Sequence, residues 1–180
     1  MTFQDYLDEI QKCIDNNCFI ASLTMALLIP DVCGKLLHPE YSKSEKRYKA
    51  WYIKYLGNEI VNSLDVNRKT PWISEDIAYS LRCQMLHDIT PNIEKDRIHH
   101  AENKIDKICV MFSDSSVLFS SGTYHTVLGK EERKMTINAK SLSEQLLNCG
   151  RDFYKDHKEE IDKRYMTIKD GFGDKYLWTK

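Results

Sequence analysis

The sequence predicts a mainly α protein, a helical bundle of four to five helices that carries a small β-hairpin. Two patterns support this fold class. Over most of the chain, apolar residues recur every three or four positions, as they do on one face of a helix. Between about residues 104 and 140 they alternate with polar residues, which is the period of a strand. A chain of 180 residues, 42% hydrophobic and 29% charged, is typical of one folded domain.

We therefore expect a single domain over residues 1–180. Residues 1–90 form the core of the bundle, and residues 104–140 form the β-hairpin as an insertion. A C-terminal helix follows over 141–165, and 166–180 form a tail.

The first two helices are predicted over 3–15 and 19–37. The first has carboxylates and glutamines between apolar residues at helical spacing. The second is apolar on most sides, and Pro30 is expected to bend it. Its apolar run is too short for a membrane span and contains Pro30 and Asp31, so we expect a helix buried in the bundle and no membrane.

A third helix is expected to begin near Ser42, because Ser42 and Glu45 have the spacing of a capping box. A loop is expected over 62–73, and the fourth helix begins after Ser74 and ends near His87. The buried stripe of this fourth helix is predicted to be Ile77, Leu81 and Met85, widened by Ala78 and Leu86.

The β-hairpin is predicted to pair residues 105–113 with residues 134–140, joined by a long polar connection. Residues 117–121 could form a short third strand. Ser141 or Ser143 is then expected to cap the last helix.

The charge and cysteine content exclude several classes of function. The formal net charge is −1, so a site for a polyanion must come from a local patch. The six cysteines include no CxxC pair, and no residues have the spacing of zinc ligands, so we expect mostly buried, reduced thiols and neither metal nor cofactor. The first residues do not resemble a secretory signal, which favours the cytoplasm.

Arg82 and His87 on the fourth helix are the candidate functional pair. Arg82 lies beside the buried stripe, and His87 lies about 140° around a regular helix from it. Two arrangements would bring them to one target. The last turn of the helix could fray before Pro91, or a symmetric dimer could place two copies of each residue in one cleft.

The segment LRCQMLHD, with Arg82, four residues and His87 near the end of the fourth helix, resembles the Arg-x4-6-His motif of the HEPN superfamily. The resemblance implies an up-and-down four-helix bundle and a dimeric, metal-independent endoribonuclease, often a toxin or a phage-defence protein, so an antitoxin is a candidate partner. Arg82 would hold the phosphate, and His87 would transfer a proton to or from the ribose 2′-hydroxyl and the leaving oxygen.

Three residues are candidates to support this pair. Cys83 follows Arg82 where active members of the superfamily usually have a polar residue, which leaves catalysis open, and it could also contact His87 one turn later. Asp31 is costly in its apolar surroundings unless it is paired, so it either bonds Arg82 or satisfies backbone groups at the bend. Asp88 directly follows His87.

Lys43, Arg47 and Lys54 stand among aromatic residues of the third helix and are candidate RNA-binding residues. The alternative interpretation is an amphipathic helix whose aromatic residues face inward and whose lysines lie in water.

Two other functions stay open. The chain could be a non-catalytic module that binds a nucleotide or a protein, with Arg82 in a cleft and His87 held by structural bonds. It could also be a structural domain of a phage or mobile-element protein, with Arg82 buried in an ion pair.

Overall fold

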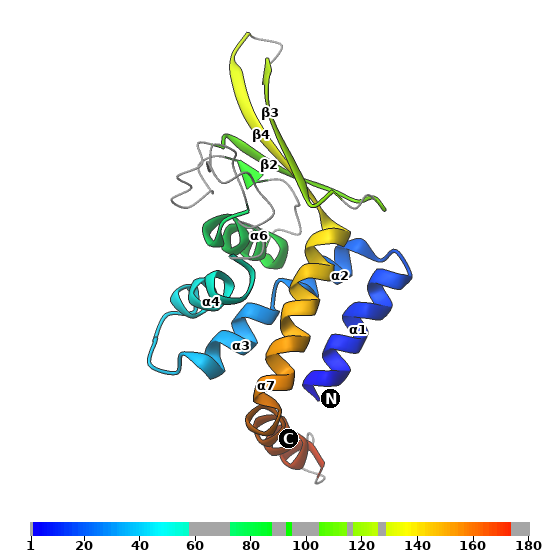
Figure 1. Ribbon diagram of the computed structural model, residues 1–180, viewed down its shortest axis with the longest axis vertical. Helices are drawn as coiled ribbons and strands as arrows, with labels where there is room; N and C mark the ends of the chain where they lie inside the picture. Colours follow the sequence, from blue (N-terminus) through cyan, green and yellow to red (C-terminus); the bar gives the residue numbers. More distant parts are fainter. Residues whose placement is uncertain are drawn as a thin grey trace, which may run out of the picture.

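The computed structural model describes residues 2–57, 73–87, 93–94, 105–114, 117–125 and 129–173. Within these residues the chain is mainly helical, as the sequence predicted, and it carries a small mixed sheet where a β-hairpin was expected (Figure 1). The sheet stands at one end of the bundle, and the N-terminus lies toward the other end.

The helix α1, Phe3–Asp15, has the predicted bounds, and Thr2 and Asp5 form a capping box at its start. The predicted helix over 19–37 is instead two helices, α2 (Phe19–Ala26) and α3 (Ile29–Leu37). In one continuous helix the ring of Pro30 would clash with the carbonyl group four residues earlier. The chain breaks before that proline, which then lies in the first turn of α3, where its missing N–H costs little.

By length and hydropathy alone, the stretch Phe19–Leu37 could cross a membrane. The same features are expected of helices in the middle of a bundle, and here α2 contacts α1 and α7 while α3 contacts α4 and α7. We therefore interpret it as a pair of core helices, and the absence of a membrane partner stays a prediction.

The third predicted helix is α4, Ser44–Tyr52, which continues into one π-helical turn, η1, over Ile53–Gly57. The predicted capping box is wrong, because Lys43 occupies the N-cap position and no side chain caps the helix. The helix α6, Glu75–His87, begins and ends as predicted, and the Ile77 N–H donates to Ser74 Oγ at 3.3 Å. Residues 62–72 of the predicted loop lie outside the described residues.

The sheet contains β1 (Ile93–Glu94), β2 (Lys107–Met111), β3 (Phe119–His125) and β4 (Glu131–Asn138), in the order β1-β2-β4-β3.

The predicted pairing of the two long strand segments as a hairpin is wrong. β2 and β4 are adjacent but parallel, and the hairpin is formed by β3 and β4. The predicted third strand explains the difference. It is longer than expected and pairs antiparallel with the strand that follows it, so the connection from β2 to β4 becomes a crossover, as a parallel pair requires.

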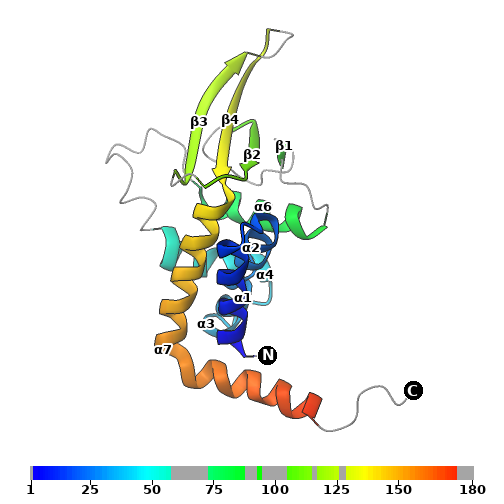
Figure 2. The same cartoon turned by 90° about the vertical axis from the view of Figure 1, so that its right-hand side faces the viewer.

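The last helix, α7, spans Ala139–Gly173 and is kinked at His157, where φ is −122° and ψ is 22° (Figure 2). Its cap is Asn138 and not Ser141 or Ser143, because the Ser141 N–H donates to Asn138 Oδ1 at 3.0 Å. The helix runs past the predicted end near Tyr165, so the first part of the predicted tail is helical. Residues 174–180 lie outside the described residues.

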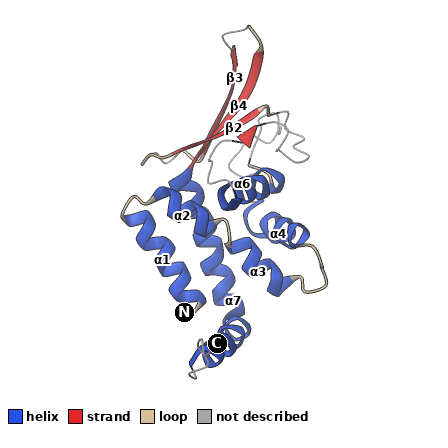
Figure 3. Ribbon diagram, turned by 180° about the vertical axis from the view of Figure 1, so that it is seen from behind, coloured by secondary structure: helices blue, strands red, loops and turns tan. Residues whose placement is uncertain are grey.

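The bundle is completed by α7, which contacts α1, α2 and α3. Seen from behind, α1 and α4 lie on opposite sides of α7 and α3 (Figure 3). One core of buried residues runs from Phe3 and Trp51 in the helices to Ile108 and Ile137 in the sheet. The bundle and the sheet therefore share their hydrophobic core, and the four-helix bundle implied by the HEPN resemblance stays a prediction.

Candidate anion-binding site around Arg82

Arg82 lies on α6 beside the buried Leu81 and keeps 19% of its side chain exposed. Its Nε donates to Asp31 Oδ2 at 2.8 Å, and the side chain of Asp31 is also 19% exposed. The expectation that Asp31 bonds Arg82 is confirmed. Asp76, which lies in the first turn of the same helix as Arg82, bonds Lys49 at 2.5 Å.

Asp31 lies in the first turn of α3, where the positive end of the helix dipole favours a carboxylate. Burial nevertheless raises the pKa of the Asp31 carboxyl group above its ordinary value, although the hydrogen bond and charge of Arg82 and the charge of Arg47 lower it. The Arg82 guanidinium stays charged at all ordinary pH values. Asp31 therefore takes up a proton more readily than an exposed aspartate does.

Arg82 and Asp31 line a pocket of about 380 Å³. The other lining residues are Tyr6, Leu28, Val32, Lys35 and Arg47. Three of the lining side chains are cations, and one is a carboxylate, so the pocket favours a negatively charged ligand.

Arg47 enters this pocket from α4. Its Nη1 donates to the carbonyl oxygens of Tyr41 at 2.6 Å and of Ser42 at 3.4 Å, which are neutral acceptors. Its Nε is buried and has no hydrogen-bond partner in the described part of the chain. A buried donor without an acceptor is costly, so this N–H group weakens the present packing of the Arg47 side chain.

Lys35 follows Asp31 by one turn of α3 and is exposed. It therefore adds a third cation to the pocket that Arg47 and Arg82 line.

His87 is the last residue of α6 and is exposed, and it does not line the pocket of Arg82. The structure of one chain therefore does not bring the two residues of the motif together. The helix stays regular to its last described residue, which keeps His87 about 140° around the axis from Arg82.

Cys83 and Asp88 were the other two residues predicted to support the Arg82 and His87 pair. Cys83 is half-buried, and its Sγ accepts a weak hydrogen bond from Arg82 Nη1 at 3.9 Å. Among the described residues, no hydrogen bond joins Cys83 to His87. Asp88 lies outside the described residues.

The candidate RNA-binding residues do not form one surface with the aromatic rings of α4. Tyr48, Trp51 and Tyr52 are buried in the core, so these rings cannot stack on bases. Lys43 and Lys54 are exposed on the other face, as the amphipathic interpretation expects. Arg47 alone of the three basic candidates lines the Arg82 pocket.

Sequence reasoning missed the meeting of Lys35, Arg47 and Arg82. The spacing of Asp31 and Lys35, one helical turn apart, was a usable signal for two of the lining residues. Nothing local to α4 indicates that Arg47 faces this pocket. Among the described residues, no group of three His, Cys, Asp or Glu side chains could hold a metal ion.

Comparisons of this chain with protein-family models, with curated proteins and with solved structures found no match. We therefore infer the function of this chain from the residues of the site itself.

Proposed function

We propose that this chain is a binding module for a phosphate-bearing anion, such as a nucleotide or the end of an RNA strand, held in the Arg82 pocket. The observation that carries the proposal is the meeting of three cations from three helices, Lys35, Arg47 and Arg82, in one pocket with a single carboxylate. Arginine side chains recognise phosphate oxygens with paired N–H groups, and Lys35 would act as a point charge.

The apolar wall of the pocket suits the uncharged part of such a ligand. Leu28, Val32 and Tyr6 supply it, and the Tyr6 hydroxyl donates to the Met25 carbonyl oxygen at 2.6 Å, which holds the ring in place. A ligand with both an anionic group and an apolar or ring portion would use both parts of the site.

Isothermal titration with inorganic phosphate, a nucleoside monophosphate and a short single-stranded RNA tests this proposal. We expect the nucleotide or the RNA to bind more tightly than phosphate alone. Lys35→Gln and Arg47→Gln should weaken binding, whereas Lys54→Gln, an equal change of charge on an exposed lysine that does not line the pocket, should not. Equal affinity in all three variants, or no binding by the wild type, would contradict the proposal.

A second candidate function is the metal-independent endoribonuclease implied by the HEPN resemblance. One observation favours it: His87 is exposed at the end of the same helix as Arg82 and has no hydrogen bond or ion pair within the described residues. A homodimer that joins two such helix ends would place Arg82 and His87 of both copies in one cleft. Attack of the ribose 2′-hydroxyl would then leave a 2′,3′-cyclic phosphate, with His87 transferring the proton and Arg82 holding the phosphate.

Incubation of the protein with mixed RNA in EDTA separates the two functions. A ribonuclease should release cyclic-phosphate ends, and His87→Ala should abolish the cleavage without weakening nucleotide binding. Mixing the His87→Ala and Arg82→Ala chains should restore part of the activity if the site is shared across a dimer. If the wild type cleaves none of several RNA substrates, the ribonuclease proposal is rejected and only the binding module remains. An antitoxin partner and a cytoplasmic location stay predictions.

A further inference from the structure

The turn between α1 and α2 brings two cysteines together. The Cys18 N–H donates to the Cys13 carbonyl oxygen at 2.8 Å, and the Asn17 N–H donates to the Ile14 carbonyl oxygen at 3.0 Å. Asn17 has a positive φ of 58°. These two bonds around a left-handed residue form a Schellman motif, which places the side chain after the turn beside the last turn of the helix.

The backbone bond limits the separation of the two cysteines. With an N···O distance of 2.8 Å, standard bond lengths keep the Cα atoms of Cys13 and Cys18 within about 6.7 Å of each other. Disulfides join residues whose Cα atoms are about 4.4–6.8 Å apart. The fold therefore keeps the two Cα atoms close enough for a disulfide, although five positions separate the cysteines in the sequence.

The two thiols differ in their exposure. Cys18 is exposed, and its Sγ lies 3.7 Å from the Asn16 carbonyl oxygen. Cys13 is half-buried; burial raises the pKa of its thiol, and the neighbouring Cys18 and Glu9 raise it further. Because Cys18 is the exposed thiol of the two, it is the residue that an oxidant in solution meets first.

We propose that Cys13 and Cys18 form a site of reversible oxidation by hydroperoxides. The Cys18 sulfur attacks one peroxide oxygen, the O–O bond breaks, and Cys18 becomes a sulfenic acid. The other peroxide oxygen leaves with the thiol proton, as water from hydrogen peroxide or as an alcohol from an organic hydroperoxide. The Cys13 sulfur then attacks the Cys18 sulfur, the S–O bond breaks, and the hydroxyl group leaves as water with the proton of Cys13. The two thiols lose two electrons to one peroxide and become a disulfide, which a dithiol or glutathione can reduce.

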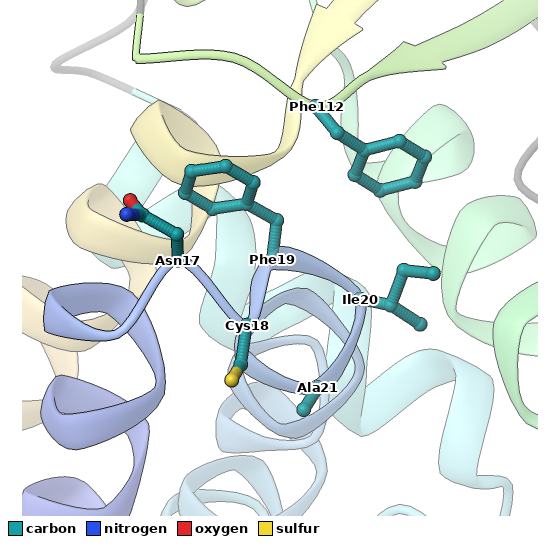
Figure 4. A pocket seen from close by; sticks show the side chains of 6 residues that line it. All are labelled: Asn17, Cys18, Phe19, Ile20, Ala21 and Phe112. Carbon is teal, nitrogen blue, oxygen red and sulfur yellow. The ribbon is translucent and has the colours of Figure 1, made fainter.

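The oxidised turn would form one wall of an apolar pocket of about 590 Å³ (Figure 4). Ile20 and Phe112, which are 52% and 39% exposed, line this pocket together with Cys18. Figure 4 shows the Cys18 sulfur pointing away from Phe112, so a bond to Cys13 would not need to fill the pocket. Oxidation would instead fix the turn from which Phe19 and Ile20 extend.

Peptide mapping of the full chain after exposure to a limiting amount of hydrogen peroxide tests the proposal. A protease that cleaves before aspartate cuts before Asp8, Asp15 and Asp31, which places Cys13, Cys18 and Cys33 in three peptides. The expected product is one linked species that joins peptides 8–14 and 15–30 and that dithiothreitol separates. Buried Cys33 serves as the internal control and should stay reduced.

Two variants assign the steps. In Cys13→Ser, Cys18 should stop at the sulfenic acid, which dimedone traps. In Cys18→Ser, Cys13 should stay reduced at the same peroxide dose. Linkage of Cys18 to any other cysteine or to a second molecule, or oxidation of Cys18 no faster than that of Cys33, would overturn the proposal.

Discussion

The carbonyl oxygen of Arg47 lies 2.6 Å from the position that a β-carbon on Gly34 would occupy. Only a glycine lets the backbone of α3 approach that of α4 so closely, since real Cβ atoms do not lie this near to backbone oxygens. The contact also fixes the position of the Arg47 backbone beside α3. From there the Arg47 side chain reaches the pocket that Asp31 lines from α3.

Gly34→Ala should lower the free energy of unfolding by about 1–3 kcal/mol, because α3 and α4 must separate to admit the methyl group. The matched control is Gly57→Ala, whose β-carbon would lie an ordinary 3.8 Å from the Tyr52 carbonyl oxygen. That variant should be neutral or more stable by up to about 1 kcal/mol, since alanine is the better helix former. Urea denaturation of both variants measures the difference, and equal effects would argue against the close contact.

Arg82 and Asp31 should be energetically coupled. Arg82→Ala leaves a buried carboxylate without its main partner, and Asp31→Ala leaves the guanidinium Nε without an acceptor, so each variant should destabilise the fold by about 1–3 kcal/mol. The double variant should lose less than the sum of the two, by about 0.5–3 kcal/mol. A double-mutant cycle in urea at neutral pH measures this coupling, and additive effects would contradict it. The cycle also shows how far lower stability contributes to lost activity in Arg82→Ala.

Anion binding should strengthen as the pH falls toward the raised pKa of the Asp31 carboxyl group. The raised pKa of Asp31, above the ordinary 3.8, means that the folded protein binds this proton more tightly than the unfolded chain does. Protonation of Asp31 therefore favours the fold as the pH falls through its raised pKa, and that contribution is lost as the pH rises above it. The same proton removes the negative charge from the pocket, so the attraction of Arg82 and Arg47 for an anion increases.

Calorimetry with sulfate, whose charge is constant over this range, measures the effect. The matched variant is Asp31→Asn, which should bind sulfate more tightly than the wild type at neutral pH and should show a weaker dependence on pH. Parallel pH profiles for the two proteins would exclude Asp31 as the responsible group.

Asn138 should be worth more to stability than an ordinary helix cap. It is fully buried; its Oδ1 accepts from the Ser141 N–H, and its Nδ2 donates to the Ser113 carbonyl oxygen at 3.2 Å. Asn138→Ala should cost about 1 kcal/mol for the cap and roughly 0.5–1.5 kcal/mol more for the lost hydrogen bond to the half-buried Ser113. Thr2→Ala removes only the cap of α1, which is exposed. Thermal unfolding should therefore show the larger loss for Asn138→Ala, and equal losses would contradict the role of the bond to Ser113.

The sequence by itself determined the helices whose faces are set by local spacing. Ile77, Leu81 and Met85 recur every four positions and are all buried in the structure, because residues one turn apart lie on the same face of a helix. The pairing of Asp31 with Arg82 was also predictable, since a carboxylate in apolar surroundings needs a partner and few cations border the core.

Only the tertiary structure decided which distant segments meet. The parallel pairing of β2 with β4 depends on β3 taking the other edge of β4, and alternation of apolar residues is the same in a parallel and an antiparallel pair. Arg47 lines the same pocket as Arg82 because Gly34 lets α4 approach α3. Cys13 lies near Cys18 because Asn17 reverses the direction of the chain. The spacing of apolar residues specifies which face of a helix or strand is buried. Which residues from two different elements then meet in one site depends on how those elements pack together.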